Sequence, residues 1–309
     1  MRRSVLIGLV IAMHLFGCGP RQDAPRVDSG IRELNGTSLF VKTVGSGEPV
    51  IVIHGGPVLE HGYLLPHLEP LAEGYRLIFF DQRLSGRSTA DVEPSLVRME
   101  QFVKDIEALR ESEGLERFHL MAHSWGGLIA MHYAIAHGDR LRSLTLLDSM
   151  PGSSELWQQE QAELGRRVPA EDRAARQAIL DSDAYARKEA DTFVELYRLS
   201  FRSQFHRPEL VDRLEFYIAP DLEQRSERFA AITQDLRDYD IHLELARVSV
   251  PVLLLYGSDE VSTSTSGPVL AEHLREAEFV VIPDAGHFPF VEQRDAVLDR
   301  IRVFLSEHG

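Results

Sequence analysis

The sequence predicts an α/β doubly wound fold: a mostly parallel sheet with helices on both faces and an inserted helical cap. Short, almost continuously apolar runs recur along the chain, and segments with helical spacing separate them. A long, highly charged stretch, 151–247, interrupts this alternation. Strands that are apolar throughout are expected where helices cover both faces of a parallel sheet. The predicted strands span 49–54, 76–81, 118–122, 143–148, 252–256 and 279–282.

Two segments show the helical pattern clearly. Residues 99–109 and 297–305 place apolar side chains three and four positions apart, so each is predicted to form a helix with one buried face. The stretch 151–247 contains long helical patterns, such as 190–201, and no convincing strand. We therefore expect a core of 31–150 and 248–309. The helical cap, 151–247, should cover the strand ends, where open α/β sheets bind ligands.

The composition excludes one class of function. The 309 residues carry a formal net charge of −15, and no basic stripe stands out. Binding to nucleic acid is therefore not expected. The acidity otherwise indicates solubility and carries no information on the fold.

The first eighteen residues read as an export signal. Arg2 and Arg3 precede an apolar run, 5–16, that is shorter than the roughly 20 residues a membrane span needs. The run ends in LFGC (15–18), which resembles a bacterial lipobox, so Cys18 would become the lipidated N-terminus. Residues 19–30 read as a flexible tether. We expect a bacterial lipoprotein anchored to a membrane, with the folded domain in the periplasm or extracytoplasmic space. An uncleaved anchor or an ordinary signal peptide is the alternative.

The stretch AHSWG (122–126) predicts a nucleophilic serine. It follows the Gly-x-Ser-x-Gly pattern of a strand-to-helix turn, with Ala122 in place of the first glycine. Such a turn projects the hydroxyl of Ser124 into a site, and the following helix N-terminus favours a developing oxyanion. Ala122 adds only one methyl group, which is the mildest departure from the pattern.

A serine hydroxyl needs a base and a group that orients the base. His287 lies in a Gly-His turn directly after a predicted strand and is the expected base. Asp259 is the preferred acid, because the segment between it and His287 has the length of one helix and one strand. Glu260 is the alternative, since the common Gly-x-x-Asp spacing counted from Gly257 reaches that position. Asp148, at the end of an earlier strand, is a remoter possibility.

The turn HGGP (54–57) follows the first strong strand, as an oxyanion-hole loop would. The backbone N–H groups of Gly56 and Trp125 are the expected donors to the oxyanion. Metal binding is the rival use of His54, His61 and His67, but their spacing matches no usual zinc pattern. We expect neither a metal nor a cofactor.

Three blocks together resemble the proline iminopeptidase (prolyl aminopeptidase) family of α/β hydrolases: HGGP (54–57), DQRLSGRS (81–88) and HSWGG (123–127). The resemblance implies an α/β-hydrolase fold with a helical cap, a Ser-His-Asp triad and no cofactor. Members of this family remove an N-terminal residue, often proline, from short peptides, and close relatives cleave esters and amides.

Three departures from the family concern the site. Val58 and Leu84 stand where the family usually has glycine. The family holds the substrate's amine with cap carboxylates in a Trp-Glu context. The sequence shows no such context around Trp157, the cap's tryptophan, and leaves Glu195 or Glu215 as candidates.

The sequence thus predicts a serine hydrolase that acts through an acyl-enzyme on a small peptide or ester substrate. An aminopeptidase for short N-terminal residues is the first interpretation. An esterase or amidase for small hydrophobic acyl compounds is the second, and a non-catalytic binding lipoprotein is the third.

Overall fold

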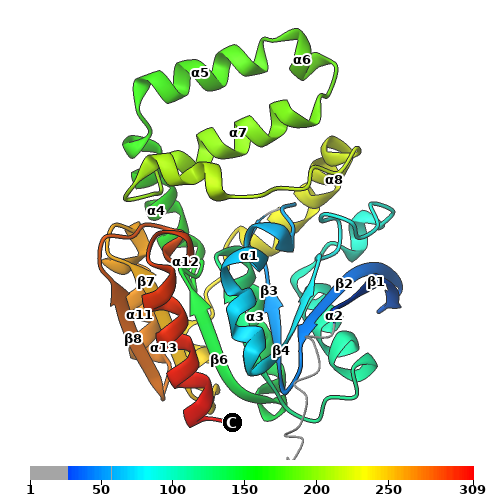
Figure 1. Ribbon diagram of the computed structural model, residues 1–309, viewed down its shortest axis with the longest axis vertical. Helices are drawn as coiled ribbons and strands as arrows, with labels where there is room; N and C mark the ends of the chain where they lie inside the picture. The colour runs from blue at the N-terminus through cyan, green and yellow to red at the C-terminus, as the bar shows by residue number, and fades with distance from the viewer. Residues whose placement is uncertain (1–26, 57) are drawn as a thin grey trace, which may run out of the picture.

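The computed structural model describes residues 27–309 except residue 57 (Figure 1). The predicted leader, Cys18 and most of the tether lie outside these residues. Residues 27–30, predicted as the end of the tether, are instead the start of a strand that pairs with the next one. Within the described ranges, none of the helices combines the length and apolar composition that a membrane span requires.

Eight strands form one sheet in the order β1-β2-β4-β3-β5-β6-β7-β8. Strands β3 to β8 run parallel to one another, and β1 and β2 join one edge as an antiparallel hairpin. The strands are β1 (Val27–Leu34), β2 (Thr37–Gly45), β3 (Glu48–Ile53), β4 (Tyr75–Phe80), β5 (Phe118–His123), β6 (Leu141–Leu147), β7 (Val252–Gly257) and β8 (Ala277–Ile282). The six predicted strands correspond to β3 through β8, so the predicted α/β fold class is confirmed.

Helices cover both faces of the sheet, which explains why the central strands are apolar throughout. Along β3, Ile51 and Ile53 belong to one hydrophobic cluster, whereas Val50 and Val52 belong to the other. The first cluster includes side chains of α2 (Met99–Ser112), α3 (Trp125–His137) and α11 (Ser266–His273). The second includes side chains of α1 (Leu65–Leu68), α12 (Pro289–Glu292) and α13 (Arg294–Glu307).

Between β6 and β7 the described chain consists of helices joined by loops, and an isolated bridge pairs Ser153 with Asp240. Figure 1 shows α5, α6 and α7 as a layer above the sheet, beyond the ends of its strands. The end of the last helix before β7 and the residues after it pack into the core, where Leu245 and Val248 join the first cluster. The helices of this segment are α4 (Ser154–Arg167), α5 (Ala170–Leu180), α6 (Asp183–Ala186), α7 (Ala190–Arg202), α8 (Leu222–Phe229), α9 (Thr233–Leu236) and α10 (His242–Leu245).

Candidate active site

Ser124 lies at a sharp turn between β5 and α3. Its backbone has φ 53° and ψ −121°, a strained conformation for a residue with a side chain. Three backbone hydrogen bonds fix this conformation. The N–H of Ser124 donates to the carbonyl of Leu147 at 3.0 Å, and its own carbonyl accepts from Gly127 at 2.8 Å and Met150 at 3.0 Å. The turn therefore holds the side chain of Ser124 at the carboxyl edge of the sheet.

The residues beside Ser124 are small because neighbouring segments approach closely. A Cβ atom on Gly126 would lie 2.6 Å from the carbonyl oxygen of His54, and one on Gly127 would lie 2.1 Å from Oγ of Ser149. Ala122, in contrast, is the fifth residue of β5, fully buried and paired with Ile53. Its methyl group is accommodated in the core, so the departure from Gly-x-Ser-x-Gly leaves the turn intact.

His287 and Ser124 line the same cavity, which has a volume of about 600 Å³. The Nδ1 atom of His287 lies 2.8 Å from Oε2 of Glu260, which is also part of the cavity wall. A serine, an imidazole and a buried carboxylate in one cavity are the groups that nucleophilic acyl transfer requires.

The structure contradicts Asp259 as the partner of His287 and places the alternative, Glu260, there. The side chain of Asp259 is half-exposed, and its carboxylate pairs with His206. It accepts hydrogen bonds from Nδ1 of His206 at 2.7 Å and from Oγ of Ser258 at 3.0 Å. After β7 ends at Gly257, the chain turns residues 258 and 259 outward and brings Glu260 back inside.

The side chain of Glu260 is ionised in this environment. Burial raises its pKa, but the charge and hydrogen bond of His287 and the backbone N–H groups of Ser262 and Val261 hold the pKa below its ordinary value. An ionised Glu260 fixes the proton of His287 on Nδ1 and leaves Nε2 free to accept a proton.

The predicted oxyanion donors, Gly56 and Trp125, also line the cavity. Trp125 is the first residue of α3, so its backbone N–H has no acceptor within the helix. Its indole donates to Oε1 of Gln82 at 2.9 Å, and the amide of Gln82 donates to the carbonyl of His54 at 2.6 Å. Gln82, from the DQR block, thus connects the HGGP turn to the start of α3.

Two residues that the sequence analysis did not single out, Tyr63 and His123, connect the loops of the site. The N–H of Gly55 donates to the hydroxyl of Tyr63 at 2.6 Å, and that hydroxyl lies 2.7 Å from Nδ1 of His123. Nε2 of His123 lies 2.9 Å from the carbonyl of His287. Burial, followed by the nearby His287, lowers the pKa of His123 well below its ordinary value, so its ring is neutral.

The loop that carries His287 also contacts the cap. The N–H of His287 donates to the carbonyl of Gln204 at 2.8 Å, and a Cβ atom on Gly286 would lie 2.1 Å from that same oxygen. Glu292 accepts the backbone N–H groups of His206 and Arg207, and that of Gly286. Residues 203–207 and the His287 loop are therefore packed as one unit.

The cap contributes most of the apolar cavity wall and one buried carboxylate. Glu160, in α4, lines the cavity, and it accepts hydrogen bonds from Oγ of Ser262 at 2.9 Å and from the N–H of Ser266 at 3.2 Å. Burial raises its pKa. The apolar lining residues of the cap are Pro151, Trp157, Leu164, Val168, Phe201, Phe229, Ala230, Ile232 and Leu236.

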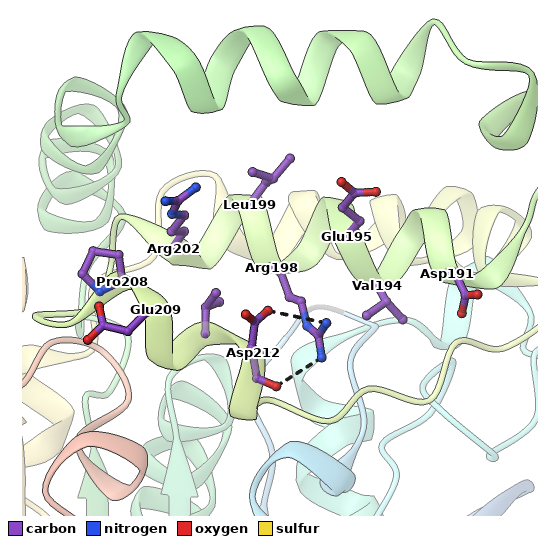
Figure 2. Close-up of a pocket in the computed structure, with 10 residues that line it drawn as sticks. Asp191, Val194, Glu195, Arg198, Leu199, Arg202, Pro208, Glu209 and Asp212 are labelled. Atoms are coloured by element: carbon purple, nitrogen blue, oxygen red, sulfur yellow. Dashed lines mark hydrogen bonds and ion pairs between the residues drawn. The ribbon is translucent and has the colours of Figure 1, made fainter.

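The two cap carboxylates suggested by the sequence are not part of this cavity wall. Glu195 lines a separate hollow of about 650 Å³ between α7 and residues 208–212, together with charged side chains of both signs (Figure 2). Glu215 is likewise absent from the described lining of the Ser124 cavity. Glu160, which lies three residues after Trp157 in α4, is the cap carboxylate in the described lining of this cavity.

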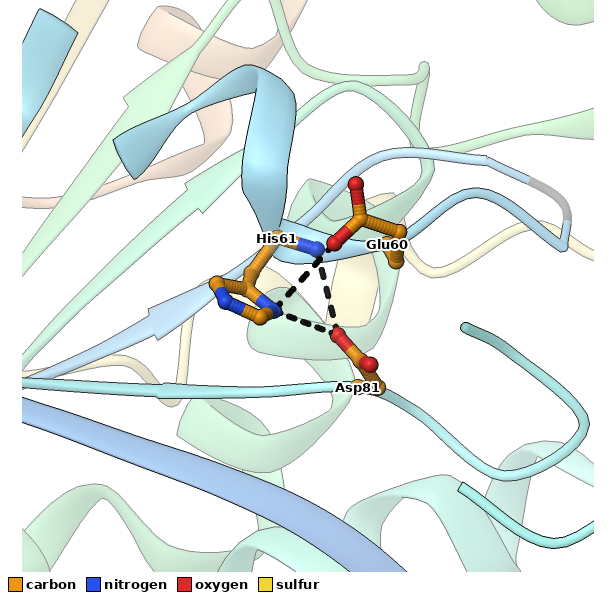
Figure 3. Close-up of side chains that lie close together, drawn as sticks. All are labelled: Glu60, His61 and Asp81. Carbon is orange, nitrogen blue, oxygen red and sulfur yellow. Dashed lines mark hydrogen bonds and ion pairs between the residues drawn. The ribbon is translucent and has the colours of Figure 1, made fainter. Parts of the chain in front are cut away.

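Of the three histidines considered for a metal, His61 lies with two carboxylates, Glu60 and Asp81 (Figure 3). Nδ1 of His61 is 2.6 Å from Oδ1 of Asp81. The carboxylates also accept protein donors: Glu60 accepts the N–H of Gly62 at 2.8 Å, and Asp81 that of Arg87 at 2.8 Å. These contacts join the segment after β3, which carries Glu60 and His61, to Asp81 at the end of β4.

Val58 and Leu84, the two departures from glycine, both have positive φ, at 60° and 64°. The backbone therefore keeps the conformation that favours glycine although both side chains are larger. Leu84 is fully buried in the first hydrophobic cluster. Its packing there offsets the backbone strain.

The fold and these residues define a hydrolase of the α/β-hydrolase class. The family model for the alpha/beta hydrolase fold matches residues 48–293, so the chain belongs to this family. It is 30% identical to a proline iminopeptidase of Lactobacillus crispatus (strain ST1) over 270 residues, which cover 84% of this chain and 90% of that protein. A proline iminopeptidase of Lactobacillus helveticus (strain DPC 4571) is 27% identical over 293 residues, 88% of this chain and 96% of the relative.

Solved structures show the same fold. A proline iminopeptidase of Mycobacterium smegmatis superposes with a TM-score of 0.66 at 23% identity, over 91% of this chain and 98% of that one. An esterase from Thermogutta terrifontis superposes with a TM-score of 0.63 at 24% identity, over 91% and 100%. The chain is thus a serine hydrolase of the α/β-hydrolase family, within its proline iminopeptidase-like members.

Proposed function

We propose that this enzyme removes the N-terminal residue, proline first, from short peptides through a triad of Ser124, His287 and Glu260. One observation carries the proposal: the strained turn at Ser124 opens into a cavity where His287 is paired with the buried Glu260. The proline iminopeptidases similar to this chain support the choice of substrate.

The positions of these groups support the following reaction. Nε2 of His287 takes the proton of Ser124 as Oγ attacks the carbonyl carbon of the N-terminal residue. The N–H groups of Gly56 and Trp125 stabilise the oxyanion, each by roughly 3 kcal/mol. His287 then protonates the departing amide nitrogen, the peptide bond breaks, and water hydrolyses the acyl-enzyme by the same steps in reverse. Glu260 faces the imidazolium whenever His287 is charged.

We place the free amine of the substrate against Glu160. This carboxylate is the cap's acidic group in the described cavity wall, and a cationic amine would offset the cost of keeping it charged while buried. The apolar cap residues around it suit a pyrrolidine ring. An N-acylated substrate has no cation to offer and is expected to bind poorly.

The test compares proline p-nitroanilide, its N-acylated form and p-nitrophenyl butyrate, with wild-type enzyme and Ser124→Ala. Cleavage of the free-amine anilide alone, lost in Ser124→Ala, supports the aminopeptidase. Cleavage of the butyrate alone would instead support an esterase for small hydrophobic acyl groups. The mainly apolar cavity wall favours that second function. The hydrogen bonds that Glu160 accepts favour it too, because they satisfy this carboxyl group without a substrate amine.

We further propose that Cys18 is lipidated and anchors the exported domain to a bacterial membrane. The support is the basic and apolar leader that ends in LFGC (15–18). Metabolic labelling with a fatty acid should label wild-type protein and leave Cys18→Ser unlabelled. Equal labelling of both, or of neither, would contradict the anchor.

A further inference from the structure

Asp148 is a second carboxyl group beside His287. It follows β6, and Glu260 follows the adjacent strand β7, so the two side chains reach the same edge of the sheet. One oxygen each of Asp148 and Glu260 and one ring nitrogen of His287 all lie within 4.8 Å of one another. Asp148 also lines the cavity that contains Ser124.

The two carboxyl groups differ in their hydrogen bonds. Oε2 of Glu260 is paired with His287, and its Oε1 accepts the N–H of Ser262 at 3.4 Å. Oδ1 of Asp148 accepts the N–H of Gly257 at 2.9 Å. Oδ2 of Asp148 is buried and has no hydrogen-bond partner in the described part of the chain. An unpartnered buried carboxylate oxygen is costly, whereas a protonated one costs much less.

Two carboxylates at this distance in a buried site do not both ionise readily. Burial, then the charges of Glu260 and Glu292, raise the pKa of Asp148 well above its ordinary value. Tyr256, which is also buried beside it, stays protonated because burial raises its pKa as well. His287 faces Glu260 directly and holds the pKa of that carboxyl down. The single negative charge of the cluster therefore belongs on Glu260.

We infer that Asp148 is a reserve acid of the triad: it holds a proton while Glu260 is charged and supports His287 itself when Glu260 carries no charge. The inference rests on the proposed function, because it assigns a positioning residue to the same catalytic site. When a neutral side chain replaces Glu260, the repulsion on Asp148 disappears. Asp148 then releases its proton to solvent, and its carboxylate faces the imidazolium that forms as Ser124 attacks.

A double-mutant cycle tests this assignment with wild type, Asp148→Asn, Glu260→Gln and the double variant. We expect the loss of kcat caused by Asp148→Asn to be at least about tenfold larger in the Glu260→Gln background than in wild type. The KM should stay the same, because neither group binds the substrate. In Glu260→Gln, kcat should rise with pH as Asp148 ionises, and this titration should be missing from the double variant. Independent, multiplicative losses would overturn the inference.

A second measurement needs no substitution of Asp148. Infrared difference spectra at neutral pH between wild type and Glu260→Gln should show the loss of one buried protonated carboxyl band, while the bands of other carboxyl groups, such as Glu160, cancel. A difference spectrum without this loss would overturn the inference. Failure of the proposed function looks different: wild type would then show no hydrolysis that depends on Ser124. An active, Ser124-dependent enzyme without coupling between Asp148 and Glu260 contradicts only the reserve acid.

Discussion

The hydroxyl of Tyr63 lies 2.7 Å from Nδ1 of His123, and it connects the turn HGGP (54–57) to the turn at Ser124. Because the N–H of Gly55 donates to this hydroxyl, the hydroxyl must donate its own proton to His123. His123 then carries its proton on Nε2 and donates it to the carbonyl of His287. One directed chain of hydrogen bonds therefore sets the positions of three loops that meet at Ser124.

Replacing Tyr63 with phenylalanine removes this chain and leaves the ring in place. We expect Tyr63→Phe to lower kcat by about tenfold with little change in KM, and to cost about 1–3 kcal/mol of unfolding free energy, because a buried donor, the N–H of Gly55, and a buried acceptor, Nδ1 of His123, lose their partner. Steady-state kinetics and urea unfolding measure both. Tyr185→Phe in the cap is the matched control. A normal kcat in Tyr63→Phe would show that the loops hold their positions without the hydroxyl.

Two substitutions at adjacent positions test which carboxylate is the acid of the triad. Glu260→Gln should lower kcat at least about tenfold, since the imidazolium of His287 loses the charge that faces it. Asp259→Asn should leave kcat within about threefold of wild type, because this carboxylate contacts His206 at the surface. Steady-state kinetics on the same substrate decides between them. The reverse order of effects would restore Asp259 as the acid.

The stability of the enzyme should fall in mild acid because of buried, neutral histidines. Burial, opposed by the charge of Asp81, lowers the pKa of His54 from 6.5 to about 4. Below pH 6.5 His54 binds a proton in the unfolded chain, whereas in the folded chain it stays neutral down to about pH 4. The free energy of unfolding that is present above pH 6.5 is therefore lost as the pH falls. From His54 alone we expect a loss of about 2 kcal/mol between about pH 7.5 and about pH 5.

Urea unfolding at the two pH values measures this loss, with His54→Gln as the comparison. Carboxyl groups whose pKa does not depend on His54, such as Asp148, contribute in the opposite direction and equally to both proteins. The difference between the two pH dependences therefore reports His54 together with its effect on the neighbouring Asp81. Identical pH dependences would show that His54 titrates normally in the folded state.

The close contact at Gly127 predicts a large effect from one methyl group. Gly127→Ala places a Cβ atom 2.1 Å from Oγ of Ser149, so either Ser149 or the turn at Ser124 must shift. We expect a cost of about 1–3 kcal/mol of unfolding free energy and a loss of activity. Gly165→Ala is the matched control in α4, where a Cβ atom meets nothing within 4 Å and should stabilise the helix. Similar stability changes in both variants would contradict the contact.

The sequence predicts the central strands well because they are buried on both faces, which produces continuous apolar runs. It does not predict the β1–β2 hairpin, since this edge has one exposed side and β1 carries exposed polar residues. Local spacing likewise brings Ser124 and His287 to the carboxyl edge of the sheet. Local sequence does not decide whether Asp259 or Glu260 pairs with His287. Asp259 instead pairs with His206, which lies more than fifty positions earlier in the chain. Tyr63 escapes prediction for the same reason: its partner is 60 positions away in the chain.

The hydrogen bond from the N–H of His287 to the carbonyl of Gln204 attaches the cap to the loop that carries His287. A lid that swings away as a rigid body would break this bond and withdraw the backbone that supports the imidazole. We therefore expect substrates to reach Ser124 while residues 203–207 stay in contact with the His287 loop. Exchange of the cap with that of a relative therefore has a defined boundary. A graft that keeps residues 203–207 should keep the backbone contact of His287, and one that replaces them is expected to lose turnover as well as to change selectivity.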